Sequence, residues 1–568
     1  MKPLLYLAAI FYFFSLLLTP LGFNFSFSPA GQEPRGIYHV LHFDSGDDAG
    51  YYAYLKSLFI DHDLDFFNEP YYIHRYEVMD TGYIVNPWKI GPGILWFPFF
   101  FLAHLQAKIY NLIGIPLSLH GLSFPYVGIT ALASSAYAFM GLILNYLILR
   151  RWFSSQAAFF SILLLFATTG LIYFSFIRSR MPHACDYFLI NLFIYMWLGF
   201  RESPDSTRAV SVGLVGGIML LTRINSAGYF LFPIYDLIFK LTKAIKLGQK
   251  LDRSIWRSYA LIFSIAFLVY SIQLFINHII SGSWSPIPSV GGYNEQIFSI
   301  KNWLGIFSQP IKLIFGDNWG LLWHAPIYLF GGVGFYFFSR NYSRQIVGPL
   351  FLSLSFPIFL FLLWPHHGMS YGQRHLLTSN VLFSFGVGCL YDHFHFRFKS
   401  LIWSTMTGLL IFWSYIQLCL FKIVIHHETQ HFVGQVFSSL NIFKSIPSLF
   451  LRSDNIFYII SQFDVHLQTP LDWYLMVVYP LQQFGVIIII LFATGYVWSK
   501  MRNYVELKLA FRRTINMLTI SFLIGLHLMV QVQSDQKSPE FIAKRKSYVA
   551  KHILYATQKP HDLGSPSR

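Results

Sequence analysis

The sequence predicts an all-α protein that crosses a membrane about thirteen times. Its 568 residues are 55% hydrophobic and only 12% charged, with a mean hydropathy of +0.49. This is the composition of a membrane protein rather than a soluble one. Apolar runs of membrane-spanning length recur along the chain. The basic residues stand mostly in short clusters beside these runs. The formal charge of +15 therefore indicates topology and is a poor argument for nucleic-acid binding.

The first apolar run, residues 4–21, follows Lys2. It lacks a convincing small-residue cleavage site just beyond it, so we interpret it as an uncleaved span with a cytoplasmic N-terminus. The next apolar segment, 90–115, contains Pro92 and Pro98. If this segment also crossed the membrane, the later basic clusters would all face outward, against the positive-inside rule. We therefore expect it to form a re-entrant or interfacial hairpin.

The remaining apolar runs alternate so that the basic clusters between them face the cytoplasm. The expected spans lie near residues 4–21, 125–149, 156–177, 184–200, 209–222, 226–239, 258–280, 321–339, 346–364, 376–392, 401–424, 473–498 and 513–531. The same order places several polar segments together on the external face. These are residues 22–124, 178–183, 281–320, 365–375, 425–472 and the polar tail 532–568.

The most acidic stretch of the chain is residues 42–80. Its acids are Asp44, Asp47, Asp48, Asp61, Asp63, Asp65, Glu69, Glu77 and Asp80. Ser45 followed by Asp48 has the spacing of a capping box, which predicts a short amphipathic helix along the membrane surface with Asp47 and Asp48 in its first turn. The two carboxylates either only complement the helix dipole, or act as a general base or metal ligand.

An arginine-rich turn is expected on the same face. Arg178, Arg180, His183 and Asp186 surround Pro182, which suits the first turn of the following span. Arg178 is explained equally well as a snorkelling side chain. Arg180 and His183, which flank the proline turn, are the stronger functional candidates.

Two further basic positions belong to this face. Lys89 stands beside Trp88, where it either anchors the chain at the bilayer surface or binds a lipid phosphate. Arg374 and His375 begin a span after a glycine-containing turn. Arginine suits bidentate phosphate recognition, and a helix N-terminus adds its dipole. The alternative for Arg374 is again a snorkelling side chain.

The remaining motifs, present and absent, indicate which class of reaction the protein could catalyse. Cys185, Cys389 and Cys419 lie in apolar stretches without metal-binding spacing, and we interpret them as packing residues. The sequence contains no phosphate-cradling glycine loop, HExxH motif or serine nucleophile elbow. Carboxylates opposite Lys, Arg and His at an external cleft suit a reaction in which a hydroxyl or amine is deprotonated and a phosphate leaves.

Taken in order, the motifs GDDAGYY, WKIGPGILW, RSRMPHA, GLLWHAPIYLF and SYGQRHL resemble those of the GT-C class of membrane glycosyltransferases. Within that class, they resemble the bacterial relatives of protein O-mannosyltransferases and aminoarabinose transferases. The resemblance covers roughly residues 1–395, which would form the catalytic core with its external acidic loop 22–124. Residues 396–531 would add C-terminal helices with the external loop 425–472, and residues 532–568 a polar tail.

The resemblance implies a donor sugar linked to a polyprenyl phosphate in the bilayer, and a lipid, glycan or protein acceptor reached from outside. The loop acid of the family would be Asp47, with Asp48 at a position usually held by Glu, and its phosphate-binding lysine would be Lys89. His183 stands where relatives often have Asp, at a position implicated in metal or acceptor binding. A divalent metal, Mg²⁺ or Mn²⁺, is therefore an open question, because a neutral histidine can still bind one.

The hypothesis is an inverting transfer at the periplasmic face of a bacterial inner membrane. Asp47 acts as base or orients the acceptor, and Asp48 supports it or binds a sugar hydroxyl. Lys89, Arg180, Arg374 and His375 bind the donor phosphate. The alternative is a transporter or lipid flippase with a charged external vestibule. Such proteins usually show internal repeats and ionisable residues at mid-membrane depth, whereas here the charges stand at predicted span ends.

Overall fold

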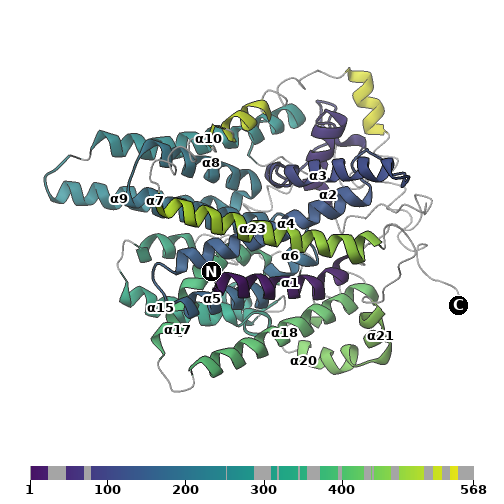
Figure 1. Ribbon diagram of the computed structural model, residues 1–568. Helices are drawn as coiled ribbons and strands as arrows, with labels where there is room; N and C mark the ends of the chain where they lie inside the picture. Colours follow the sequence, from purple (N-terminus) through teal and green to yellow (C-terminus); the bar gives the residue numbers. More distant parts are fainter. Residues whose placement is uncertain are drawn as a thin grey trace.

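Helices dominate the computed structural model, and several of them run in nearly the same direction across Figure 1. The structure describes residues 2–23, 46–68, 78–250, 252–286, 309–315, 319–342, 346–354, 371–394, 399–427, 436–437, 441–461, 473–503, 516–517, 519–526 and 538–547. Within these ranges the only extended pairing is an isolated bridge between Val78 and Ile84. The all-α prediction is therefore confirmed for the described part of the chain.

The α-helices keep the labels of Figure 1. They are α1 (Lys2–Phe23), α2 (Gly46–Lys56), α3 (Gly91–Leu112), α4 (Phe124–Leu149), α5 (Ser155–Thr168), α6 (Gly170–Phe176), α7 (His183–Glu202), α8 (Ser206–Thr222), α9 (Leu231–Lys246), α10 (Arg253–Ser281), α13 (Gln309–Phe315), α14 (Leu321–His324), α15 (Ile327–Asn341), α17 (Asn380–His393), α18 (Lys399–His427), α20 (Asn441–Ser445), α21 (Ser453–Ser461) and α23 (Tyr479–Asn503). Short 3₁₀ and π turns join them at η1 (Ser57–Asp61), η2 (Phe66–Asn68), η3 (Ile224–Phe230), η4 (Arg374–Ser379), η5 (Ile446–Phe450) and η6 (Tyr474–Val478).

The described chain contains five helices that are long and apolar enough to cross a membrane. They are Lys2–Leu21, Phe124–Leu149, Arg253–Ser281, Leu401–Val424 and Tyr474–Gly495. The pair α5 and α6 makes a sixth if it is counted as one span bent by 71°. The multi-pass prediction is confirmed. The number thirteen stays a prediction. Two expected spans, 346–364 and 513–531, lie partly outside the described residues, and the helices at 184–200, 209–222, 226–239, 321–339 and 376–392 are not among the long apolar helices.

The expected hairpin at residues 90–115 is wrong. The chain forms one continuous helix, α3, with Pro92 in its first turn and Pro98 inside it. Proline is tolerated at a helix start because its missing N–H has no intrahelical partner there. α3 packs antiparallel to α4, where the Tyr137 hydroxyl donates to the carbonyl oxygen of Leu95 at 2.7 Å. α3 is not among the helices apolar enough to cross the bilayer, which agrees with leaving it out of the spans.

The expected surface position of the acidic helix is also wrong. α2 begins at Gly46, and Ser45 lies outside the described residues. Its residues 48–50 and 52–56 are buried, so α2 is an interior helix rather than one lying on a membrane. Gly50 allows this packing, because a side chain there would collide with the ring of Trp88. The ring of Trp88 therefore covers a face of α2 that the sequence predicted to be exposed.

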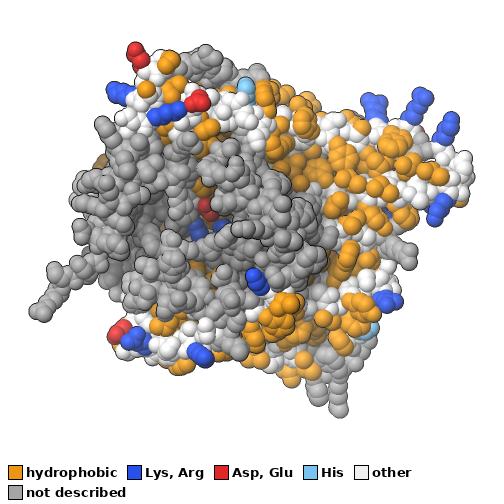
Figure 2. Space-filling view, turned by 180° about the vertical axis from the view of Figure 1, so that it is seen from behind, with side chains coloured by type: hydrophobic (Ala, Val, Ile, Leu, Met, Phe, Trp, Pro, Cys, Tyr) orange, Lys and Arg blue, Asp and Glu red, His pale blue; other side chains and the backbone are white. Residues whose placement is uncertain are grey.

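One end of the helix bundle carries the predicted cytoplasmic basic clusters. Arg151 pairs with Glu202 at 2.6 Å, and Arg201 pairs with Asp236 at 3.3 Å. The tip between α9 and α10 adds a group of exposed cations, visible at one corner of Figure 2. They are Lys243, Lys246, Lys250, Arg253 and Arg257. The described basic residues around Arg151, Arg201 and the α9–α10 tip thus share one end of the structure.

Helix α10 runs from the basic tip to the region of the acidic segment. It has 29 residues, which at 1.5 Å per residue is about 43 Å, enough to cross a bilayer. Its last turn contacts the acidic segment, because the Thr81 hydroxyl donates to the carbonyl oxygen of Ile280. The segment containing Asp80 and the tip containing Lys250 therefore lie at opposite ends of one membrane-length helix.

This geometry predicts a labelling pattern. Cysteines introduced as Asp80→Cys and Lys250→Cys should react with a membrane-impermeant maleimide from opposite sides of the membrane. The three native cysteines are buried, so the unmodified protein should label weakly and serves as the control. The measurement compares labelling of intact cells with that of inverted vesicles. Reaction of both positions from one side would contradict the arrangement.

Candidate functional site

The two acids of the first turn of α2 have different surroundings. Asp48 has no exposed surface, whereas about a third of the Asp47 side chain, 33%, is exposed. Carboxylates in the first helical turn are stabilised by the helix dipole and the free N–H groups there. Asp47 is therefore the carboxylate that an approaching molecule can reach, and Asp48 is an interior charge.

Asp48 is held between the two arginines of the turn that joins α6 to α7. Arg178 Nη2 lies 3.7 Å from one carboxylate oxygen, and Arg180 Nε lies 3.9 Å from the other. Both arginines are buried. The 71° bend between α5 and α6 directs this turn into the molecule. Arg178, which the sequence left evenly balanced, thus joins Arg180 at the site.

Asp47 is paired with Arg374, a residue 327 positions later in the chain. Arg374 Nη1 lies 3.4 Å from Asp47 Oδ2. The preceding turn is possible because Gly372 has a positive φ of +66° and packs against His324, leaving no room for a side chain. Gln373 Nε2 fixes the turn further by donating to the carbonyl oxygen of Trp319 at 2.8 Å. The SYGQRHL motif therefore positions one guanidinium group opposite Asp47.

A fourth arginine, which sequence reasoning missed, completes the group. Arg223, just after α8, lies 2.9 Å from Nδ1 of His183 and 3.8 Å from Asp186. The Ser226 hydroxyl donates to Asp186 at 2.6 Å. The predicted topology already placed Arg223 on the same face as the other candidates. No motif surrounds this arginine, which directly follows a short apolar run.

Tyr51 stands at the centre of the charged groups. Its ring meets Trp88 edge-on, with the centroids 6.3 Å apart. Burial raises the pKa of the Tyr51 hydroxyl far above its usual range, while the positive charges of Arg223 and Arg374 oppose this shift. Tyr51 is therefore a neutral hydrogen-bonding group one helical turn after Asp47.

Lys89 lies in the loop just before α3, and its ammonium group contacts a backbone carbonyl rather than an acid of α2. Its ammonium donates to the carbonyl oxygen of Pro286, and the next residue, Ile90, donates its N–H to the side chain of Gln273 at 3.0 Å. Burial lowers the pKa of Lys89 to about 8. The structure thus brings Asp47, Asp48, Arg180, His183 and Arg374 together, and places Lys89 beside them through Trp88.

His375 follows Arg374 in the same turn. Burial lowers the pKa of the His183 imidazole, and the nearby positive charges of Arg223, Arg374, His375 and Arg178 lower it further. The His183 ring also packs on Phe174, with centroids 4.1 Å apart. The arginine turn, the α8 end and the SYGQRHL turn therefore converge on one histidine, although they are far apart in sequence.

The charged group is recessed rather than placed at the ends of the long helices. The end of α6 contacts the middle of α4, and the start of α7 contacts the second half of α4. Ser135 donates to the carbonyl oxygen of Ser175 at 2.7 Å, and Asn145 donates to the Tyr187 hydroxyl at 3.0 Å. Figure 2 shows acidic and basic side chains together in a recess at the centre of one face. The short helices α6 and α8 end at this depth, which the sequence did not predict.

The described residues of the site leave an excess of positive charge. Arg178, Arg180, Arg223 and Arg374 face the carboxylates Asp47, Asp48 and Asp186, so four cations stand against three anions. Positive groups gathered in a recess attract anions strongly because the surrounding protein screens them less than water does. The arrangement therefore suits an anionic ligand.

The donor atoms of the site do not form a metal centre within the described part of the chain. No three side chains of His, Cys, Asp or Glu come together there. The Nδ1 atom of His183 contacts Arg223, and Asp48 contacts two arginines. In the described structure these groups contact arginine side chains. A role for a divalent metal stays a prediction.

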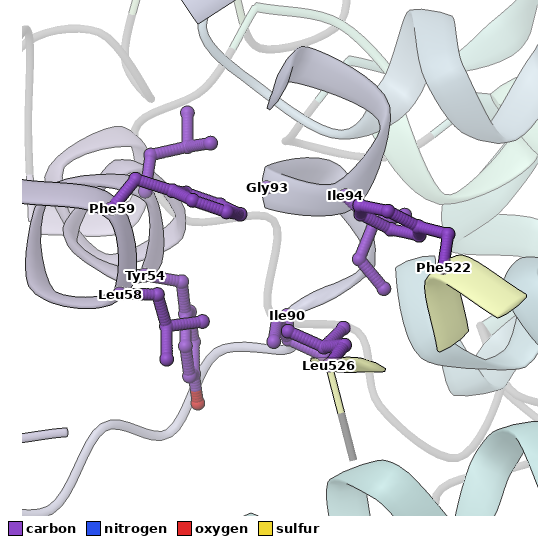
Figure 3. A pocket seen from close by; sticks show the side chains of 9 residues that line it. Tyr54, Leu58, Phe59, Ile90, Gly93, Ile94, Phe522 and Leu526 are labelled. Atoms are coloured by element: carbon purple, nitrogen blue, oxygen red, sulfur yellow. The ribbon is translucent and has the colours of Figure 1, made fainter. Parts of the chain in front are cut away.

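An apolar pocket lies next to the charged group. It is lined by Tyr54, Leu55, Leu58, Phe59, Ile90, Gly93, Ile94, Phe522 and Leu526, and Figure 3 shows most of these side chains surrounding it. The residues come from α2 with η1, from the start of α3, and from the segment 519–526. Ile90 is the neighbour of Lys89, so the pocket begins beside the buried lysine.

Comparison with known proteins gives similar solved structures but no family. No family model matches the chain, and no curated protein matches it. The structure is similar to that of ArnT from Cupriavidus metallidurans bound to undecaprenyl phosphate, with 14% identity and a TM-score of 0.43 over 99% of this chain and 80% of that one.

Two further similar structures are of the Archaeoglobus fulgidus oligosaccharyltransferase. One is the complex with Zn and sulfate, at 14% identity and a TM-score of 0.44, covering 82% of this chain and 57% of that one. The other, AglB with an inhibitory peptide and a dolichol-phosphate, has 12% identity and a TM-score of 0.42, covering 82% and 60%. At these identities and TM-scores the activity of this protein is a matter for proposal.

The pairing of Asp48 predicts a stability difference between two arginines. Arg180→Ala should lower the free energy of unfolding by about 3 kcal/mol, because it removes one of the cations beside a fully buried carboxylate. Arg151→Ala is the matched control, since its exposed pair with Glu202 should contribute less than about 1 kcal/mol. Thermal unfolding in detergent measures both. Equal effects of the two variants would show that the Asp48 pair is not a structural requirement.

Proposed function

We propose that this protein is a membrane glycosyltransferase. It would transfer a sugar from a polyprenyl-phosphate-linked donor to an acceptor at the face that carries the acidic segment. The observation that supports this most strongly is the pairing of two neighbouring carboxylates, Asp47 and Asp48, with arginines from separate turns. The motifs at these positions are those that resemble the GT-C class.

The two carboxylates would have separate roles. Asp48 is fully buried between two arginines and would position the turn that binds the donor phosphate. Asp47 is partly exposed and shares Arg374 with that phosphate site. An arriving phosphate would compete for Arg374 and so release Asp47 to act as a base. General base catalysis requires that the base reach the acceptor proton. The partly exposed Asp47 can do so, whereas the fully buried Asp48 cannot.

The reaction proposed is a single displacement at the anomeric carbon. An oxygen or nitrogen of the acceptor forms a bond to that carbon while the bond to the phosphate oxygen breaks. The acceptor proton goes to Asp47, and the bonding electrons leave with polyprenyl phosphate. Arg180, Arg374, Arg223 and Lys89 would stabilise the negative charge that develops on the leaving phosphate, which is the largest contribution expected from such a site.

The apolar pocket of Figure 3 supports a lipid-linked donor. Its lining has no charged side chain, and Lys89 stands at its edge beside Ile90. The cavity is small, about 10 Å³, which is room for about one water molecule. An isoprenoid chain would therefore enter only if lining side chains such as Phe59 and Phe522 moved, and its phosphate would then lie near the lysine.

The orientation follows from the positive-inside rule and belongs to this proposal. The end with the exposed lysines of α9 and α10 would face the cytoplasm, together with the N-terminus. The acidic segment and the recessed site would then face the periplasm of a bacterial inner membrane. The alternative function, a transporter or flippase, would use the same recess for passage rather than transfer.

The central experiment measures donor turnover. Purified protein in nanodiscs is incubated with a panel of radiolabelled polyprenyl-phosphate sugars, and release of free polyprenyl phosphate is followed. Asp47→Asn should lower turnover by a factor of about 10²–10⁴, because it removes the base while keeping the shape of the side chain. Asp80→Asn is the matched control, since Asp80 belongs to the same segment but its side chain is 99% exposed.

Three results have clear meanings. Full transfer activity in Asp47→Asn would contradict its role as the base. Donor binding without turnover would mean that the acceptor is missing from the assay. Failure to bind any donor, together with accumulation of a substrate inside vesicles, would favour transport.

Lys89 predicts a pH dependence of donor binding. Its pKa is lowered to about 8 by burial, so its positive charge is present below pH 8 and is lost as the pH rises through that value. The KM for the donor should therefore rise above about pH 8. In Lys89→Arg this rise should disappear up to pH 10, because arginine stays protonated. An unchanged pH profile in Lys89→Arg would remove Lys89 from the phosphate site.

A further inference from the structure

The last described segment of the chain contacts the second half of the acidic segment and the residues just after it. Residues 539–547 are helical and form the yellow helix at the upper right of Figure 1. The two terminal nitrogens of Arg545, Nη1 and Nη2, donate to the two carboxylate oxygens of Asp65 at 2.9 Å and 2.7 Å. Nη1 also donates to the carbonyl oxygen of Gly82 at 3.0 Å. One side chain thereby joins Asp65, within the acidic segment, to Gly82, which lies just after it.

The Arg545 contact is largely shielded from solvent. The side chains of Arg545 and Asp65 are only 14% and 12% exposed. The guanidinium group also lies over the rings of Phe67 and Phe541, 4.3 Å and 4.4 Å from their centroids. A bidentate pair between aromatic rings is a specific contact, because a lysine cannot reproduce its planar geometry. Surface attraction between a basic tail and an acidic loop would not require it.

The neighbouring pair differs in exposure. Lys546 lies 2.8 Å from Asp80, but its side chain is 48% exposed and that of Asp80 is 99% exposed. Exposed pairs of this kind stabilise little. They are useful as a probe, because an amine and a carboxylate in direct contact can be coupled chemically. The buried contact of Arg545 therefore holds the C-terminal segment on the acidic segment. The exposed Lys546–Asp80 pair provides a way to detect this attachment.

The segment before the tail explains how the tail reaches this position. Asn516 contacts the start of α8, where the Ser211 hydroxyl donates to it at 3.1 Å. A few residues later, Phe522 packs on Phe97 of α3 with centroids 5.8 Å apart. The chain thus passes from the start of α8 at Asn516 to α3 at Phe522. Together with Leu526, Phe522 also closes the apolar pocket of Figure 3.

We propose that the C-terminal segment 538–547 is a tether that holds the acidic segment in place, with Arg545 as a positioning residue for the recessed site. Asp65 and Gly82 flank the parts of the segment that lead into α2 on one side and into Lys89 on the other. Fixing both together keeps the two acids of α2 and the lysine loop in register. The tail that the sequence marked only as polar and basic thereby acquires a structural role at the site.

Chemical coupling tests the attachment without any assumption about activity. A water-soluble carbodiimide activates the Asp80 carboxyl, and the Lys546 amine displaces the urea to leave an amide, which peptide mass spectrometry detects in the nanodisc-embedded protein. The wild type should show this cross-link. Arg545→Ala should lower its yield several-fold, and Lys544→Ala should not, because Lys544 is an exposed neighbour with the same charge.

Hydrogen exchange provides a second readout that does not require the reporter pair. Peptides covering residues 57–68 should exchange faster in Arg545→Ala and in a chain ending at residue 537, and should be unchanged in Lys544→Ala. The reciprocal variant, Asp65→Arg combined with Arg545→Asp, should restore part of the protection. A merely destabilised protein would instead exchange faster throughout, including in α4.

The effect on catalysis is tested through the transfer reaction proposed above. Arg545→Ala should lower kcat by about ten-fold with little change in the donor KM, because a misplaced base slows the chemical step more than binding. Absence of the Lys546–Asp80 cross-link in the wild type would overturn the tether. So would unchanged exchange and kcat in Arg545→Ala. Since coupling and exchange need no substrate, they decide the tether even if the transfer reaction itself is wrong.

Discussion

The buried carboxylate of Asp48 is the constraint on which the rest of the site depends. An ionised carboxylate without exposed surface is very unfavourable unless charged partners are supplied. Arg178 and Arg180 supply them from a turn that must enter the interior, and the bend between α5 and α6 allows this. Once that turn is fixed, the start of α7 follows, and with it His183 and its contact to Arg223.

The recess results from helices of unequal length. α4 has 26 residues and passes the site on one side, whereas α6 has seven and α8 has 17. Polar turns can lie at membrane depth only where protein rather than lipid surrounds them. Here the surrounding helices provide that protein, so the arginines reach the level of the middle of α4 without facing lipid. A reaction in such a place gains from weak screening of charge.

The sequence predicted part of the site because residue type and topology point in the same direction there. Asp47, Asp48, Arg180, His183 and Arg374 were all assigned to one face, and the structure brings them together. Arg223 was missed because a single arginine after a short apolar run carries no motif. The surface helix and the hairpin were wrong for a related reason. Periodicity shows which residues share a helix face but not whether Trp88 or water covers it.

The sequence by itself determined that the protein is helical, crosses a membrane several times, and has its acidic segment and its basic clusters at different places along the chain. These properties follow from local hydropathy and charge, which need no knowledge of distant contacts. Only the tertiary structure decided which arginine meets which carboxylate, how deep the site lies, and that the tail returns to Asp65. Those pairs join residues hundreds of positions apart, and their energies depend on burial and geometry that exist only after the helices have packed.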